Sequence, residues 1–258
     1  MKKIAVVGAG LVGSLQAIFM AKKGYQVEVF ERRADMRKQQ MSAGRSINLA
    51  LSNRGWKALK AVGVDHEIAK MAIPMYGRIM HDTEGNTTYQ SYGKEEEAIY
   101  SVSRGGLNRT LMDLAESFEN VHFKFNHRCH DVDLELNKIT FIDENEADHI
   151  HQFDHIFATD GAFSAVRSRM QKNDRFNYQQ YYLDHGYKEL SIPPSKNGKH
   201  QIDKNALHIW PRGKFMLIAL ANEDGSFTCT LFFPFEGEES FSTIHTDEEI
   251  TSFFKKTF

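Results

Sequence analysis

Three glycines near the N-terminus have the spacing of a dinucleotide-binding loop. Gly8, Gly10 and Gly13 form a Gly-x-Gly-x-x-Gly motif, and Glu31 lies eighteen residues after the last glycine. In such a motif the first glycine permits a tight turn, the second lets backbone approach a pyrophosphate, and the third lets a helix pack on a strand. The carboxylate suits ribose hydroxyls and would repel a 2′-phosphate. These residues predict a site for FAD or NAD and exclude bound NADP.

A second candidate binding segment begins at Asp160 and Gly161. It continues through Ser164 to Arg167 as an Asp-Gly-x-x-Ser-x-x-Arg motif and follows a short apolar run at 154–159. The run predicts a buried strand, and the residues after Ser164 predict a helix. Taken by itself, the motif is better explained by a turn in which Ser164 caps that helix.

The elements around the glycines must form a βαβ unit. Residues 3–7 are apolar without alternation, which is typical of a strand buried on both faces. Apolar residues at helical spacing follow in 11–23, Gly24 suits a helix C-terminus, and 26–30 predict a second strand. Such a unit imposes a parallel strand pair with a right-handed crossover.

Helices and antiparallel strands are expected in the rest of the chain. Apolar periodicity predicts helices at 52–62, with Ser52 as N-cap, and at 105–118. Alternation and turn residues predict a meander in the second half. The expected strands are 121–125, 132–136, 206–210, 214–220 and 226–233, and the stretch 74–100 is expected to add strands to the same sheet.

Composition restricts the class of protein. The 258 residues carry 32 basic and 34 acidic side chains, with 41% hydrophobic residues, as in an ordinary globular protein. The near-neutral charge argues against nucleic acid as a partner. No apolar run approaches the roughly 18–20 residues of a membrane helix. Two isolated cysteines, Cys129 and Cys229, and no signal peptide predict a reducing, cytoplasmic setting.

Other chemistries find no support in the spacing of reactive residues. Histidines gather at 127–130 and 149–155, but neither cluster matches a zinc signature, so no metal is expected. The Gly-x-Ser-x-Gly elbow of serine hydrolases is absent from the sequence.

Segments along the whole chain resemble the kynurenine 3-monooxygenase family of FAD-dependent aromatic hydroxylases. The Asp160 motif is similar to the second fingerprint of such hydroxylases. The other segments that carry the resemblance are 44–52, 101–104, 185–190, 207–213 and 226–237.

The resemblance implies a fold and a division of the chain into two domains with different binding roles. The fold would be α/β, with an FAD-binding Rossmann-like parallel sheet and an interleaved antiparallel β-sheet substrate domain. The FAD-binding domain would comprise 1–72 and 101–174, and the substrate domain 73–100 and 175–258.

The resemblance also implies an activity. FAD would be bound and NADPH would be the co-substrate, and dioxygen would hydroxylate L-kynurenine to 3-hydroxy-L-kynurenine through a flavin C4a-hydroperoxide, in tryptophan degradation. The partners would be these small molecules, without nucleic acid or metal, and this segment gives no indication of membrane association.

Site residues follow from the same resemblance. Arg78 and Tyr92 match a pair that clamps the substrate carboxylate, although from the residues alone they would be a solvated strand residue and an ordinary surface or core aromatic. No catalytic side chain is expected, because the substrate's amino group activates its own ring. The implied cofactor contacts are Gly8, Gly10, Leu11, Val12, Gly13, Glu31, Arg32, Arg33, Arg45, Ala50, Arg104, Cys129 (through its backbone), Asp160 and Gly161.

Family members continue beyond Phe258, into a part that carries a Gly-Asp motif for the flavin and further substrate contacts. We therefore expect a chain truncated at its C-terminus. Two alternatives remain open. One is a non-catalytic fragment that binds a dinucleotide weakly or not at all. The other is an NAD-dependent dehydrogenase, which explains the βαβ unit but not the later motifs.

Overall fold

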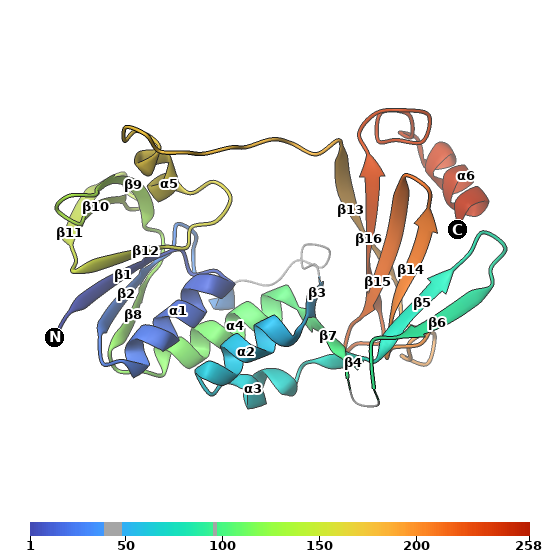
Figure 1. Ribbon diagram of the computed structural model, residues 1–258, viewed down its shortest axis with the longest axis horizontal. Helices are drawn as coiled ribbons and strands as arrows, with labels where there is room; N and C mark the ends of the chain where they lie inside the picture. Colours follow the sequence, from blue (N-terminus) through green and yellow to red (C-terminus); the bar gives the residue numbers. More distant parts are fainter. Residues whose placement is uncertain (39–47, 95–96) are drawn as a thin grey trace. The chain divides into compact units, whose positions relative to one another are not determined.

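The computed structural model describes residues 1–38, 48–94 and 97–258, and Arg45 lies outside them. The chain divides into two compact units that alternate along the sequence. Each unit gathers segments that are distant in sequence, as the colours of Figure 1 show. The first unit consists of 1–41, 58–68 and 105–180, and the second of 42–57, 69–104 and 181–258.

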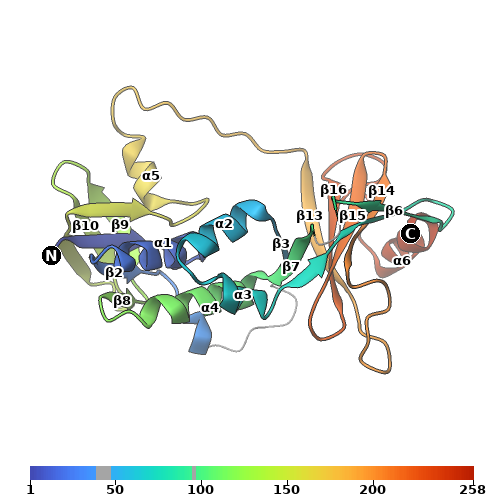
Figure 2. The same ribbon diagram turned by 60° about the horizontal axis from the view of Figure 1, so that its bottom comes forward.

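The first unit is built on a parallel sheet with the strand order β12-β1-β2-β8. The predicted βαβ unit is confirmed, and the crossover helix α1 packs on this sheet (Figure 2). Its elements are β1 (Lys3–Val7), α1 (Leu11–Lys22), β2 (Gln26–Phe30), the 3₁₀ turn η1 (Met36–Lys38), nearly all of α4 (Arg104–Glu116), β8 (Val121–Lys124), β9 (Arg128–Asp133), β10 (Lys138–Ile142), β11 (Asp148–Gln152), β12 (His155–Ala158) and α5 (Ala165–Met170).

A small antiparallel sheet, β11-β10-β9, covers one face of the parallel sheet. Alternating residues of β1 and β2 face it, whereas Ile4 and Val6 point to the opposite face. Phe30 stacks on Phe141 with ring centroids 3.8 Å apart. The shared core comprises Ala5, Val7, Phe30, Val132, Ile139, Phe141, Phe153 and Val166.

The strand predicted at 132–136 is wrong, because β9 ends at Asp133 and a turn follows. The Asp133 carboxylate accepts hydrogen bonds from the backbone N–H groups of Glu135 and Leu136, both at 3.0 Å. Asn137 then takes a positive φ of 50° before β10 begins. The apolar alternation therefore spans a hairpin turn, in which Asp and Asn are favoured residues.

The second unit contains a six-stranded sheet with the order β13-β16-β15-β14-β5-β6. The predicted meander is confirmed in β14, β15 and β16, and the 74–100 stretch adds β5 and β6. All pairs are antiparallel except β14 with β5. The strands are β5 (Gly77–His81), β6 (Thr87–Ser91), β13 (His185–Ile192), β14 (Ala206–Arg212), β15 (Phe215–Ala221) and β16 (Phe227–Pro234).

A three-stranded sheet and one helix complete the second unit. The sheet has the order β3-β7-β4 and is formed by β3 (Asn48–Leu51), β4 (Ile73–Met75) and β7 (Ile99–Ser103). Helix α6 (Asp247–Thr257) begins with a capping box between Thr246 and Glu249 and buries Phe253 against the large sheet. The predicted helices are present as α2 (Asn53–Ala61) and α4, and α2 and the short α3 (Asp65–Ala69) contribute residues to both units.

A membrane-spanning helix is absent from the described part of the chain.

Candidate functional site

The glycine loop joins β1 to α1 at the carboxyl edge of the parallel sheet. Gly8 has a φ of +100°, and a Cβ placed on it would lie 2.7 Å from the Thr159 carbonyl oxygen. A Cβ on Gly13 would overlap the Gly8 carbonyl oxygen, whereas one on Gly10 would meet nothing within 4 Å. The fold itself therefore requires two of the glycines. The open space at Gly10 fits a group from outside the chain, such as a pyrophosphate.

The N-terminus of α1 is equipped to face an anion. Gly10 is its N-cap and supplies no side-chain hydrogen bond, and its first turn carries no acidic residue. The first amides of a helix have no partner within the helix, and the helix dipole places partial positive charge there. Leu11 and Val12 begin this turn, and Val12 is exposed. This end of α1 can hold phosphate oxygens through backbone N–H groups.

Glu31 follows β2 directly and lies beside the glycine loop. Its Oε2 accepts a hydrogen bond from the Ala9 N–H at 3.0 Å, and its Oε1 accepts one from the Arg33 N–H at 3.0 Å. An ionised carboxylate has about four acceptor positions, so both oxygens retain capacity for a ribose hydroxyl. The side chain is partly buried, and its position fits the role predicted from its spacing.

The Asp160 motif forms a self-supporting turn after β12. Asp160 accepts hydrogen bonds from the Ser164 hydroxyl at 2.6 Å and from the Ala165 N–H at 2.7 Å. Ser164 caps α5 by accepting the Arg167 N–H at 3.0 Å, as the turn interpretation predicted. The Arg167 guanidinium donates back to the Gly161 carbonyl, and Gly161 has a φ of +82°. These bonds are internal to the loop, and the Thr159 N–H, which donates to the Val7 carbonyl at 2.9 Å, places it at the same sheet edge as the glycines.

A cavity of about 220 Å³ opens where β1, β2 and β12 end. Ligands of open α/β sheets bind at this edge. Five predicted cofactor residues line the cavity, namely Gly8, Glu31, Arg32, Cys129 and Asp160. The other lining residues, which the sequence analysis did not single out as contacts, are Val7, Phe30, His127, Arg128, Phe163 and Ala165.

The missed residues stand next to motifs that were found. Phe163 and Ala165 belong to the Asp160 motif, and His127 and Arg128 precede Cys129. The motif spacing could have indicated the first two. The local sequence pattern does not predict that His127 and Arg128 lie near the ends of β1, β2 and β12, which are distant from them in sequence.

The Cys129 thiol forms an unreactive part of the cavity wall. Burial, with smaller contributions from the nearby carboxylates of Asp160 and Asp131, raises its pKa to about 12. A thiol is nucleophilic only as the thiolate, so this one stays protonated and inert at neutral pH. The charges that line the cavity are two guanidinium groups, of Arg32 and Arg128, and two carboxylates, of Glu31 and Asp160.

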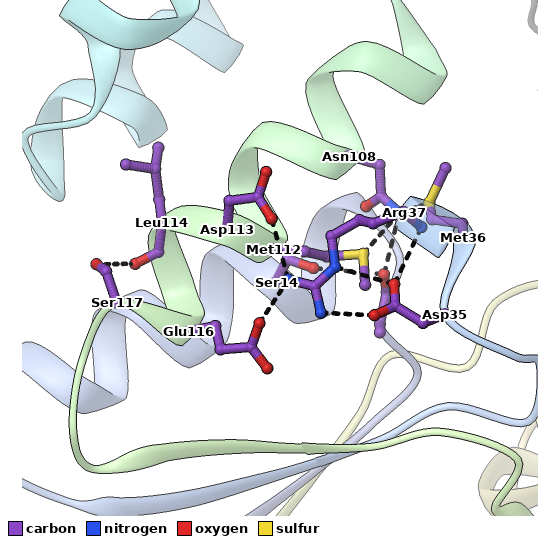
Figure 3. A network of polar contacts seen from close by, with 11 residues as sticks. Ser14, Asp35, Met36, Arg37, Asn108, Met112, Asp113, Leu114, Glu116 and Ser117 are labelled. Atoms are coloured by element: carbon purple, nitrogen blue, oxygen red, sulfur yellow. Dashed lines mark hydrogen bonds and ion pairs between the residues drawn. The ribbon is translucent and has the colours of Figure 1, made fainter. Parts of the chain in front are cut away.

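A polar network fixes the segment that follows Glu31 onto α4 (Figure 3). The Arg37 guanidinium makes two hydrogen bonds to Asp35, both at 2.9 Å, and also contacts Asp113 at 3.0 Å and Glu116 at 2.6 Å. The hydrogen bonds that Arg37 donates to Asp35 lower the pKa of Asp35 and raise the pKa of Arg37. Arg37 is 16% exposed and Asp35 is 7% exposed, which distinguishes this pair from a surface ion pair.

Arg78, the first residue of the predicted substrate pair, lies on β5, and Tyr92, the second, directly follows β6. Arg78 is opposite Gln90, and its Nε donates to the Gln90 Oε1 at 2.8 Å. Tyr92 is two residues beyond Gln90, so its side chain is a diagonal neighbour of Arg78 on the same face. Burial raises the pKa of the Tyr92 phenol, and the charge of Arg78 partly opposes this shift. The phenol therefore remains a hydrogen-bond donor at neutral pH.

The remaining predicted cofactor residues are divided between the units. Gly161 and Arg33 belong to the first unit but do not line the cavity. Ala50 on β3 and Arg104 at the start of α4 belong to the second unit, and both are exposed. Among the described residues, no group of three or more His, Cys, Asp or Glu side chains could hold a metal ion.

Solved structures of two oxygenases share this fold. The tetrameric form of 2-methyl-3-hydroxypyridine-5-carboxylic acid oxygenase matches with a TM-score of 0.73 at 16% identity, over 91% of this chain and 59% of that one. p-Nitrophenol 4-monooxygenase PnpA from Pseudomonas putida DLL-E4 has a TM-score of 0.73 and 16% identity, over 100% of this chain and 63% of that one. At such low identity they confirm the predicted α/β fold and nothing finer.

Curated relatives are similar along the whole chain. Kynurenine 3-monooxygenase of Christiangramia forsetii is 54% identical, over 100% of this chain and 57% of the relative. Kynurenine 3-monooxygenase of Sus scrofa is 44% identical, over 99% of this chain and 53% of the relative. The chain thus spans little more than half the length of these relatives. The model of the FAD binding domain family matches residues 1–253, and this chain therefore belongs to that family.

Proposed function

We propose that this chain is the FAD-binding and substrate-recognising part of an NADPH-dependent monooxygenase that hydroxylates L-kynurenine at ring position 3. The observation that carries the proposal is the 54% identity to a kynurenine 3-monooxygenase, which extends over the entire chain. The cavity at the sheet edge and the Arg78–Tyr92 pair support it, because they offer a nucleotide site and a carboxylate site. The predicted cytoplasmic location and domain division stay predictions.

The residues present fit FAD. The amides at the start of α1 would hold the pyrophosphate, Gly10 would leave room for it, and Glu31 would accept hydrogen bonds from a ribose. Asp160 and Gly161 would lie beside the phosphates. When bound, FAD would supply the redox chemistry with NADPH and dioxygen, which the protein side chains lack.

Arg78 and Tyr92 would orient the substrate through its carboxylate. Gln90 engages only the Nε of Arg78 in the described part of the chain, so the terminal guanidinium nitrogens can form a fork onto a carboxylate. The neutral Tyr92 phenol would add one more donor. Since the carboxylate of kynurenine is separated from its aromatic ring by the aliphatic side chain, these contacts would position the substrate and take no part in proton transfer.

An absorption spectrum of the purified chain, with and without added FAD, tests the cofactor assignment first. We expect the bands of oxidised flavin to persist after desalting. Kynurenine-stimulated oxidation of NADPH is the second test, and a matched titration with NAD⁺ distinguishes a dehydrogenase. Failure to retain any flavin would contradict the cofactor assignment, and flavin retention without kynurenine-stimulated NADPH oxidation would leave this chain a binding module only.

A further inference from the structure

Hydrogen bonds from three elements converge on the peptide groups of Ala9, between the first two glycines of the loop. Its N–H donates to the Glu31 carboxylate at 3.0 Å. Its carbonyl oxygen accepts the Asn108 Nδ2 at 3.1 Å and the Ser14 hydroxyl at 3.3 Å. Ala9 is buried, so these partners replace solvent. Of the three side chains, the sequence analysis predicted Glu31 but neither Ser14 nor Asn108.

The surroundings of the Asn108 side chain on α4 are unfavourable for the stability of the folded state. Its Nδ2 also lies 3.1 Å from the Met36 sulfur and 3.6 Å from the Met112 sulfur, both drawn in Figure 3. Its Oδ1 is buried and has no hydrogen-bond partner among the described residues. A buried amide oxygen without a partner destabilises the folded state. An apolar residue of the same shape would suit these surroundings better, so stability alone does not explain an asparagine here.

The carbonyl of Ala9 and the N–H of Gly10 belong to one planar, trans peptide group. In such a group the two bonds point in opposite directions. A hydrogen bond that holds the Ala9 carbonyl toward α4 therefore aims the Gly10 N–H away from α4. Gly10 is the residue whose surroundings are open and whose N–H precedes the first amides of α1.

We propose that Asn108 is a positioning residue for the pyrophosphate site. It fixes the direction of the Gly10 N–H through the Ala9 carbonyl, and it does so without contacting the cofactor. The inference rests on the proposed FAD site. It adds a residue of α4 to the elements that determine cofactor affinity.

Asn108→Leu is the principal test, since leucine keeps the shape of the side chain and removes both the donor and the unpartnered oxygen. Of its two side-chain donors among the described residues, the Ala9 carbonyl then retains the Ser14 hydroxyl. We expect the dissociation constant for FAD, measured by flavin fluorescence titration, to rise about fivefold, the effect of one hydrogen bond. We expect the midpoint of thermal unfolding without FAD to stay equal or to increase.

Asn120→Leu is the matched control in the same unit. The Asn120 Nδ2 donates to the Ala21 carbonyl at 3.0 Å and to the Tyr25 carbonyl at 2.7 Å, at the opposite end of α1. Loss of these bonds should lower the unfolding midpoint and leave FAD affinity unchanged. A purely structural role for Asn108 would make the two variants behave alike, with stability reduced, and that result would overturn the proposal.

Asn108→Asp adds a pH signature. An ionised carboxylate cannot donate to the Ala9 carbonyl, but a protonated carboxyl can. Burial raises the pKa of a carboxyl group, so its protonation falls within reach of mildly acidic buffers. The FAD affinity of N108D, relative to wild type at each pH, should recover as pH falls from about 8 to about 5. A ratio that does not change with pH would contradict the hydrogen-bond role.

Amide hydrogen exchange separates this inference from the proposed function, because it requires no bound cofactor. In N108L the peptide that contains residues 8–13 should exchange faster than in wild type, and in N120L it should not. If wild type bound no FAD, the cofactor assignment would fail, while exchange at 8–13 would still decide the role of Asn108. Unchanged exchange in N108L would overturn the inference even if FAD bound tightly.

Discussion

Gly8, Gly10 and Gly13 share a motif but meet different constraints in the folded chain. Gly13 has no space for a side chain, because the Gly8 carbonyl occupies it. A Cβ on Gly10 would meet nothing within 4 Å, and its φ of −74° is one that any residue adopts. Packing therefore demands a glycine at position 13, as conformation and packing do at position 8, and only a ligand demands one at position 10.

Substitution by alanine separates these two demands. Gly13→Ala should destabilise the protein by about 3 kcal/mol, because the new Cβ meets backbone that cannot move aside. Gly10→Ala should leave stability unchanged and weaken FAD binding roughly tenfold, because the methyl group occupies the space beside the pyrophosphate. Urea denaturation and FAD titration measure the two effects. A Gly10→Ala protein with normal FAD affinity would argue against the predicted contact.

Arg78 and Tyr92 should contribute unequally to substrate binding. In an active enzyme containing this chain, Arg78→Ala should raise the KM for kynurenine about 30-fold to 100-fold, because it removes two charge-assisted hydrogen bonds. Tyr92→Phe should raise KM only about fivefold, the effect of one neutral donor. Flavin content should not change in either variant. An unaltered KM in R78A would exclude the clamp.

At the scale of elements, two imidazoles join β5 to β14 within the second unit. The His208 ring is buried, donates its Nε2–H to the Asp203 carbonyl at 2.7 Å, and receives the His81 Nε2–H on its Nδ1 at 2.9 Å. His81 stacks on Trp210 at 4.0 Å, and the Arg212 guanidinium donates to its backbone carbonyl. Burial lowers the pKa of His81 to about 4, with smaller contributions from His208 and Arg212.

This lowered pKa makes the second unit sensitive to acid. The folded state binds the proton more weakly than the unfolded state, where the pKa of histidine is about 6.5. The contribution of neutral His81 to the free energy of unfolding is therefore fully present above about pH 6.5 and is lost as pH falls toward about 4. Urea midpoints at pH 7.5 and pH 5 should differ more in wild type than in His81→Gln. Equal differences in the two proteins would show that His81 does not contribute.

The Arg37 network connects η1 to α4. The carboxylates that contact Arg37 should differ in their contribution to the free energy of unfolding. Arg37→Leu should cost about 3–5 kcal/mol, because it leaves the buried Asp35 carboxylate unpaired. Asp113→Ala, at a carboxylate that is 64% exposed, should cost about 0.5 kcal/mol or less. The double variant Asp35→Asn with Arg37→Leu should recover part of the loss. Similar destabilisation by R37L and D113A, measured by urea denaturation, would contradict this ranking.

At the scale of the whole molecule, the segments of the two units alternate along the chain, but the first unit ends much earlier than the second. All three segments of the first unit lie before residue 181, whereas the second unit takes its last segment from 181–258. That last segment supplies β13 to β16, which include the partner of β5. The first unit is thus complete in residues 1–180, and the second is not.

Removal of residues 181–258 should therefore unfold only one unit. We expect the 1–180 fragment to keep amide protection in 1–38 and 105–180, because every strand partner of the parallel sheet is present. Residues 69–94 should lose protection, because β5 and β6 alone form an isolated hairpin, which is marginally stable at best. Hydrogen exchange with mass spectrometry resolves these peptides. Uniform protection, or uniform loss of it, would show that the units do not fold independently.

The sequence by itself determined the features that depend on short spacing. The βαβ unit, the Asp160 turn with Ser164 as its cap, and the meander of β14 to β16 are each set by local periodicity and by turn residues within about 30 positions. The same reasoning was wrong at 132–136, where apolar alternation continued through a turn that Asp133 stabilises. A pattern of period two does not distinguish a strand from a hairpin whose turn carries apolar side chains.

Only the tertiary structure decided which distant residues meet. It placed His127 and Arg128 at the cavity beside Glu31, and it brought Asn108 to the carbonyl of Ala9 across 99 positions of sequence. It also divided the predicted cofactor residues, with Ala50 and Arg104 in the second unit. These placements follow from strand order and helix packing, which depend on contacts summed over the whole chain. The local spacing of residues therefore does not predict them.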